Sequence, residues 1–199
     1  MTERQINPNL RKLAELTHNP NFEIDKTMFE KEIEIPSANA PELKGMIYVP
    51  SVNLYFAKEK SLLGKNWYDA HKELQKQGSK MPTIPEFIQF LKYLRDNPNN
   101  ENTDIYKEIT EVRYPWRAEW LDADFKVRKK QLYINYNHKL SGKSFTPQNS
   151  EVLENCLMDD CYADILNPNR QGLPTTQSNS KEFYYWYPRS DNNSVARFV

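Results

Sequence analysis

The sequence predicts an α+β domain in which two to three helices pack on a twisted antiparallel sheet with long loops. Three observations carry this prediction. Short extended segments come first, segments with helical spacing of apolar residues follow, and extended segments return after Pro115. Grouping of strands and helices into separate runs favours an α+β arrangement over a parallel sheet, whose strands alternate with helices.

The first 45 residues are predicted to be an N-terminal extension, followed by one domain over residues 46–199. Apolar residues over 10–16 predict a short helix that ends at Asn19-Pro20, since the residue before a proline disfavours helical geometry. A connector at 36–41, with a proline at each end, separates this extension from the domain. At 199 residues the chain is long enough to bury a core without disulfide bonds.

The domain opens with one or two strands over 46–57, broken at Pro50-Ser51. Trp67, Ala70, His71 and Leu74 then recur at helical spacing and predict a helix that Gly78 terminates.

The clearest start signal belongs to the next helix. Thr83-Ile-Pro-Glu86 is a capping box, in which the Thr83 side chain and the Glu86 side chain satisfy each other's backbone N–H groups. Pro85 lies in the first turn, where its missing N–H costs nothing. The buried stripe of this helix is predicted to be Phe87, Phe90, Leu91 and Leu94.

A third helix is predicted from about residue 103, with Ile105, Ile109 and Val112 facing inward. Alternating residues then predict strands, and clusters of polar and turn residues predict loops. The expected segments are strands at 116–120, 125–127 and 132–137, a loop at 142–150, a short helix at 153–157, a loop at 166–180 and a strand at 183–187.

The last residues predict a further strand, with Ala196 and Phe198 on one face and Val195, Arg197 and Val199 on the other. An unfinished edge strand exposes unpaired backbone groups. We therefore expect either that this strand joins a sheet, or that the domain is truncated in its last strands.

Composition excludes some partners. The 27 basic and 27 acidic residues balance, so no net field attracts nucleic acid or anionic lipid. No apolar run is long enough for membrane insertion and no signal peptide is evident, so the cytoplasm is the default address. Aromatic residues reach 13%, which indicates an aromatic core or, alternatively, a binding surface.

No cofactor or metal is predicted. Cys156 and Cys161 form a lone C-x4-C pair, and the three histidines are scattered along the chain, so zinc lacks an evident ligand set. Asp159, Asp160 and Asp164 lack the spacing of a calcium loop. The usual phosphate-binding and hydrolase motifs are absent from the sequence.

Several separated motifs resemble known proteins. Asn66-Trp-Tyr-Asp-Ala70 and Met81-Pro-Thr-Ile-Pro-Glu-Phe87 resemble the two-helix signature of the formylglycine-generating-enzyme branch of the C-type lectin fold. The segments 109–113, 115–123, 132–138, 171–175 and 191–198 resemble the variable proteins of diversity-generating retroelements.

This resemblance implies a non-catalytic ligand-binding or display protein whose C-terminal surface is diversified to recognise protein or other macromolecular ligands. It departs from the family in lacking the diversified segment that follows Val-Ala-Arg-Phe198. The scaffold residues expected by this reasoning are Trp67, Thr83, Glu86, Phe87, Trp116, Arg117 and Trp120. Those expected near the ligand are Trp186, Tyr187, Arg189, Asp191, Asn192 and Asn193.

The alternative is a copper-dependent oxidase of the formylglycine-generating, sulfatase-modifying type, with Cys156 and Cys161 holding the metal. That family carries its cysteines near the chain end after a Gly-Gly-Ser type motif, which this sequence lacks. We therefore expect no enzymatic activity.

Overall fold

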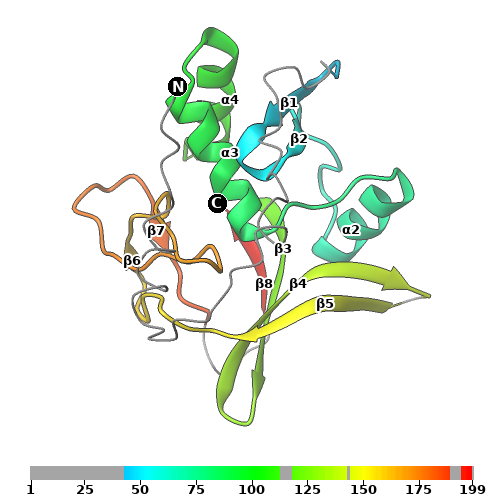
Figure 1. The fold of residues 1–199 in the computed structure, drawn as a ribbon, viewed down its shortest axis with the longest axis vertical. Helices are drawn as coiled ribbons and strands as arrows, with labels where there is room; N and C mark the ends of the chain where they lie inside the picture. Colours follow the sequence, from blue (N-terminus) through cyan, green and yellow to red (C-terminus); the bar gives the residue numbers. More distant parts are fainter. Residues whose placement is uncertain (1–42, 113–117, 143, 189–193, 199) are drawn as a thin grey trace, which may run out of the picture. The chain divides into compact units, whose positions relative to one another are not determined.

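A computed structural model describes residues 43–112, 118–142, 144–188 and 194–198, all within the unit Ala38–Val199 (Figure 1). These residues form an α+β fold with three helices and antiparallel sheets, which confirms the predicted fold class at that level. The helices are α2 (Trp67–Lys76), α3 (Ile84–Asp96) and α4 (Asn100–Thr110), with a 3-10 turn η2 (Pro50–Val52). The strands are β1 (Met46–Val49), β2 (Leu54–Ala57), β3 (Glu119–Arg128), β4 (Gln131–Ser141), β5 (Ser144–Val152), β6 (Cys161–Tyr162), β7 (Tyr184–Tyr185) and β8 (Ser194–Phe198). No helix among the described residues has the length and apolarity needed to span a bilayer.

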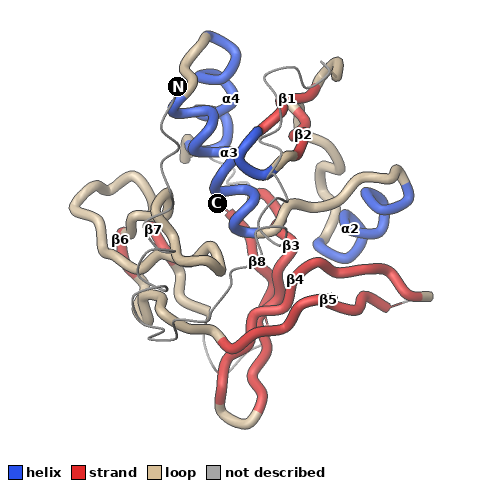
Figure 2. The backbone as a smooth tube through the Cα atoms, viewed as in Figure 1, coloured by secondary structure: helices blue, strands red, loops and turns tan. Residues whose placement is uncertain are grey.

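The main sheet has the strand order β5-β4-β3-β8, and every pair in it is antiparallel (Figure 2). The predicted hairpin forms β3 and β4, although β3 is one continuous strand from residue 119. Lys129 and Lys130 make its turn, both with positive φ (49° and 65°), which suits the twist of a two-residue hairpin loop. β1 and β2 pair as a separate ribbon that is interrupted by η2 at Pro50, as the sequence predicted.

Two irregularities lie in the centre of this sheet. The pairing of β3 with β8 shifts register between Trp120 and Asp124, which places Asp122 in a β-bulge. In β4, Asn137 has φ of 55°, a left-handed conformation that interrupts the alternation of side chains. As a result Asn135 and His138 both approach Asp124 although they are three residues apart.

The predicted loop at 142–150 is wrong, because Ser144–Val152 forms the edge strand β5. Its sequence, SFTPQNSEV, is polar and mostly exposed, so it lacks the apolar alternation by which a strand is recognised. Pro147 is tolerated opposite His138 because an edge strand needs only one of its two rows of hydrogen bonds. The long pairing with β4 decides the conformation of this segment.

The N-cap of helix α2 is Asn66, whose side chain accepts a hydrogen bond from the Asp69 N–H. Gly78 follows the last turn with φ of 71°, the left-handed geometry expected of a terminating glycine. The buried indole of Trp67 donates to the Leu121 carbonyl at 2.9 Å and fastens α2 to β3. The Gln75 side chain donates to the His138 carbonyl, so α2 also contacts β4.

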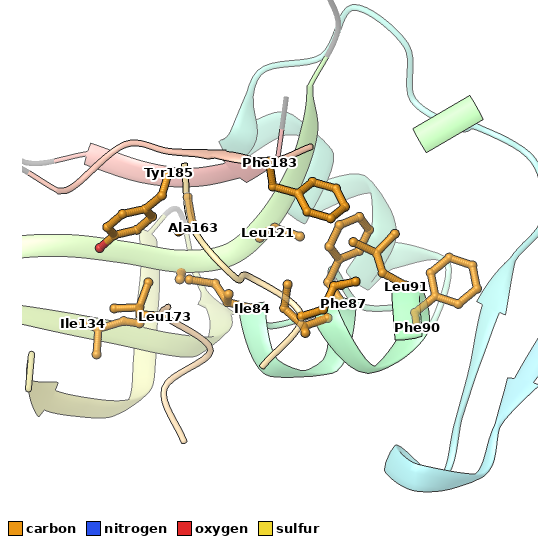
Figure 3. Packing of buried hydrophobic residues seen from close by; sticks show 14 of the residues in the cluster. Ile84, Phe87, Phe90, Leu91, Leu121, Ile134, Ala163, Leu173, Phe183 and Tyr185 are labelled. Atoms are coloured by element: carbon orange, nitrogen blue, oxygen red, sulfur yellow. The ribbon is translucent and has the colours of Figure 1, made fainter. Parts of the chain in front are cut away.

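Helix α3 has the predicted capping box and buried stripe, and it is the centre of the core (Figure 3). The Thr83 N–H donates to Glu86 Oε2 at 2.9 Å. Phe87, Phe90 and Leu91 are at most 5% exposed and pack with Leu121 of β3. Such burial is the dominant stabilising term of a domain of this size.

Replacing Thr83 with alanine is expected to lower the free energy of unfolding by about 1 kcal/mol, because the N-cap hydroxyl is lost. Thr83→Ser keeps the hydroxyl and should retain most of the stability. Urea unfolding followed by circular dichroism measures both. An alanine variant as stable as its serine counterpart would show that the cap contributes nothing.

Helix α4 begins at Asn100, earlier than predicted, with the Asn99 side chain as its N-cap. Ile105 and Ile109 pack against the core as expected. Val112 does not: the helix ends at Thr110 and the Val112 side chain is 92% exposed. Helical spacing holds only as far as the helix extends, so the inward face predicted for Val112 is wrong.

No helix forms at 153–157; this segment is irregular, and a five-residue stretch has too few turns to hold a helix alone. The loop at 166–180 is confirmed, and side-chain hydrogen bonds stabilise its conformation. Asn169 Oδ1 accepts hydrogen bonds from the N–H groups of Gln171 and Leu173. Gly172, with φ of 83°, then lies directly against the start of α3.

The last two strands, β7 and β8, are short. β7 pairs with β6 and covers only Tyr184–Tyr185 of the strand predicted at 183–187. β8 pairs with β3, and its alternation is as predicted: Ala196 is buried and the Phe198 ring lies 5.4 Å from the Phe87 ring.

Candidate functional site: an exposed aromatic row and a buried polar centre

A row of exposed aromatic side chains lies on the β6–β7 ribbon. Tyr162 and Tyr184 are directly paired across the two strands, with ring centroids 5.0 Å apart and edge-on. The Trp186 ring lies 5.0 Å from Tyr184 in a second edge-on contact. The exposed fractions are 38%, 45% and 69% for Tyr162, Tyr184 and Trp186. We call these three residues the aromatic row.

The side chains between these residues anchor the ribbon. Phe183 and Tyr185 are both 8% exposed and belong to the main core (Figure 3). The Tyr187 N–H donates to the Asp160 side chain at 2.8 Å. Alternate residues therefore fix the ribbon from below while the aromatic row faces outward, as the period of two in a strand requires.

A second group of side chains is fully buried, where α2 meets β3 and β4. It consists of His71, Asp122 and His138, which are 1%, 3% and 5% exposed. His138 Nδ1 lies 2.6 Å from Asp122 Oδ1, and the His138 backbone N–H also donates to that carboxylate. His71 Nε2 lies 3.2 Å from the same Oδ1, within ion-pair distance. We call these three residues the buried polar centre.

A second carboxylate stands behind His138. Asp124 Oδ1 lies 3.8 Å from His138 Nε2. Asp124 in turn accepts a hydrogen bond from the Asn135 amide and forms an ion pair with Lys126 at 3.0 Å. Asn135 accepts from the Ser150 hydroxyl of β5, so the network crosses three strands.

Electrostatics favours the charged forms of these groups. Burial alone would lower the pKa of His138, but the hydrogen bond to Asp122 and the nearby charges of Asp122 and Asp124 outweigh it and raise that pKa to about 9. Burial would raise the pKa of the Asp122 carboxyl, but the neighbouring imidazoles hold it below its usual value. The centre is therefore an ion pair at neutral pH, held in a region of low dielectric constant.

Sequence reasoning missed the buried polar centre. It placed His71 on the inner stripe of its helix, but it regarded the histidines as too scattered for a joint site. The fold nevertheless brings two of them together with Asp122. The left-handed Asn137 and the bulge at Asp122 shift the strand alternation on which a sequence-based assignment of faces relies.

The structure describes only two of the predicted binding residues. Trp186 is exposed, and Tyr187 is half-buried. Among the expected scaffold residues, Trp67, Thr83 and Phe87 are buried, Glu86 completes the capping box, and the half-buried Trp120 donates from its indole to the Lys65 carbonyl. The remaining predicted residues lie outside the described part of the chain: Trp116, Arg117, Arg189, Asp191, Asn192 and Asn193.

The surroundings of the two cysteines and of the acidic residues Asp160 and Asp164 indicate structural roles. Cys156 and Cys161 are half-buried free thiols, and burial raises the pKa of Cys156, which disfavours a reactive thiolate. Asp160 accepts the Tyr187 N–H, and Asp164 accepts from the Asn167 amide at 2.8 Å. Among the described residues, His71, Asp122 and His138 of the buried polar centre are close enough together to hold a metal ion. This group does not include the cysteines or Asp159.

Comparison with known proteins returns no significant match to a family model, a curated protein or a solved structure. The site must therefore be interpreted from its own geometry.

Proposed function

We propose that the chain is a non-catalytic binding protein that recognises a protein ligand through the aromatic row. The observation that carries this proposal is the row itself. Tyr162 and Trp186 each make an edge-on contact with Tyr184, and all three side chains are exposed to solvent. The residues that alternate with Tyr184 and Trp186 belong to the core and fix the ribbon. Exposed aromatic groups of this size lose the stabilisation that burial would give them. Their place on a fixed ribbon suits a surface that a partner covers.

The residue types suit recognition of another protein. Tyrosine and tryptophan offer large contact areas with few rotatable bonds, so little side-chain entropy is lost when they are covered. Both are enriched among the residues that dominate binding energy at protein interfaces. The edge-on contacts of Tyr184 with Tyr162 and Trp186 restrict the rings further. A partner would therefore meet a preorganised apolar face.

The resemblance to the variable proteins of diversity-generating retroelements supports the same function. In the proposal, the domain is C-type-lectin-like, and Arg189, Asp191, Asn192 and Asn193 remain candidate ligand-binding residues on the strength of the resemblance alone. The row lies shortly before the segment 191–198, which resembles the stretch that precedes the diversified segment in that family. The oxidase alternative gains no support from Cys156, a half-buried free thiol whose pKa is raised by burial.

The experiment is a selection from a peptide-display library against the immobilised, biotinylated chain, followed by measurement of the dissociation constants of the selected peptides. We expect Trp186→Ala to weaken their binding about 30-fold or more, the loss typical of a central interface residue. Trp186 is 69% exposed, so its replacement should leave stability nearly unchanged.

Tyr68→Ala is the matched control. Tyr68 lies on α2, away from β6 and β7 in sequence, and is 61% exposed. Peptides selected against the wild type should bind the Tyr68→Ala variant within about twofold of the wild-type affinity. The proposal fails if no peptides are enriched, or if Tyr68→Ala weakens binding as much as Trp186→Ala does.

A further inference from the structure

The buried polar centre brings three potential ligand atoms to one point from three different elements. His71 comes from α2, Asp122 from β3 and His138 from β4. One donor atom of each lies within 4.8 Å of the others, and all three side chains are at least 95% buried. Burying several titratable groups together is costly unless something satisfies them.

Hydrogen bonds do not satisfy them fully. Among the described residues, both ring nitrogens of His71 and Nε2 of His138 have no hydrogen-bond partner. His71 Nε2 is close to Asp122 Oδ1 at 3.2 Å, but not in hydrogen-bonding geometry. A buried polar atom left in this way is destabilising. An imidazole nitrogen can bind a cation through its lone pair once it has lost its proton, so cation binding at a protonated histidine releases that proton.

The donor set and its spacing select the cation. Two imidazoles and one carboxylate are nitrogen and oxygen ligands that zinc accepts at about 2.0–2.2 Å, so two donors of one zinc ion lie up to about 4 Å apart. The 2.6 and 3.2 Å separations around Asp122 Oδ1 fall within that limit, and the histidine donors lie within 4.8 Å of each other, so a small ring movement would bring all three around one ion. Calcium and magnesium prefer all-oxygen sites, and iron sites of this ligand type need open positions, which full burial opposes.

The surroundings of His138 also match a ligand. Metal-bound histidines usually present their other ring N–H to a carboxylate, which orients the ring. When Nδ1 of His138 faces the shared point, Nε2 lies 3.8 Å from Asp124 Oδ1, too far for a hydrogen bond but close enough that a small ring movement would form one. Asp124 is itself held by Asn135 and Lys126.

We propose that His71, Asp122 and His138 bind one zinc ion, in a structural site that joins α2 to β3 and β4. The carboxylate can supply one oxygen or both, so the protein offers three or four donor atoms. The site is independent of the aromatic row, and its ligand is a metal whatever the row recognises.

The test uses tag-free protein that has been stripped with a chelator and then titrated with zinc chloride. We expect one zinc per chain by calorimetry and by elemental analysis after gel filtration. With free zinc a hundredfold above the dissociation constant, the melting temperature should rise by about 5–10 °C.

His71→Leu is the informative variant. It removes two nitrogens without hydrogen-bond partners from an environment of Trp67 and Phe145 rings, and His138 remains beside Asp122, so the stripped variant should still fold. It should nevertheless lose the zinc-dependent rise in melting temperature. The double variant with Cys156→Ser and Cys161→Ser is the control, and it should bind zinc as the wild type does.

Cobalt substitution of the wild type keeps the test decisive if the His71→Leu variant fails to fold. A visible spectrum without thiolate-to-cobalt bands is expected, since all ligands are nitrogen or oxygen. Absence of stoichiometric zinc, unchanged binding in folded His71→Leu, or thiolate bands in the cobalt spectrum would each overturn the proposal.

Discussion

Replacing Asp122 with asparagine is expected to lower the free energy of unfolding by about 3–5 kcal/mol, measured on chelator-treated protein near neutral pH. Removing one partner of a buried ion pair leaves the other charge uncompensated, and losses of this size are typical. Here the partner is the His138 imidazolium, whose pKa Asp122 and Asp124 raise to about 9 in the wild type; without the Asp122 charge, the buried ring must either keep its charge uncompensated or release its proton. The asparagine side chain has nearly the same shape, so the loss reports the charge and not a cavity.

Asp104→Asn is the matched control for this prediction, because Asp104 is an exposed residue of α4. Its replacement should change stability by no more than about 0.5 kcal/mol. Urea unfolding of both variants gives the comparison. A loss below 1 kcal/mol for Asp122→Asn would mean that the carboxylate does not compensate a buried charge, and the description of the centre as an ion pair would be wrong.

Gly172→Ala is expected to destabilise the fold by about 2–5 kcal/mol, for two reasons that add. Its φ of 83° is a left-handed conformation that costs a residue with a Cβ about 1–2 kcal/mol. The new Cβ would also lie 2.7 Å from Ile84 Cγ2 and 2.8 Å from the Pro85 backbone nitrogen, too close for any ordinary contact. Relieving that overlap by moving the loop or the start of α3 costs about 1–3 kcal/mol more.

Gly64→Ala separates these two contributions. Gly64 has a similar φ of 72°, but a Cβ there would meet no atom within 4 Å. Its alanine variant should lose only the conformational part, about 1–2 kcal/mol. Thermal and urea unfolding of the two variants should differ by the contact cost. Equal losses would indicate that the 166–180 loop does not pack on the start of α3.

Gly172→Ala should also weaken ligand binding, because the loop that carries Gly172 leads to β7. Phe183 and Tyr185 of that region are anchored in the core beside α3. A displaced loop would therefore loosen the support of the aromatic row. Peptides selected against the wild type should bind Gly172→Ala more weakly than Gly64→Ala at a temperature where both are folded.

Local signals in the sequence determined much of the architecture. The α+β class, the capping box at Thr83 and Glu86, the buried stripe of α3 and the β3–β4 hairpin each depend on residues within a few positions of one another, where capping, periodicity and turn geometry act. The resemblance also named Trp186 as a candidate ligand-binding residue, and its side chain is exposed.

The tertiary structure decided the rest. β5 became a strand despite a polar, proline-containing sequence, because the edge of β4 supplies its hydrogen-bond partners. Val112 faces solvent because the helix ends before it. His71, Asp122 and His138 meet because a helix and two irregular strands converge, and neither the bulge at Asp122 nor the left-handed turn at Asn137 has a local signature. Distances between residues far apart in sequence are set by packing of whole elements, which periodicity along the chain does not encode.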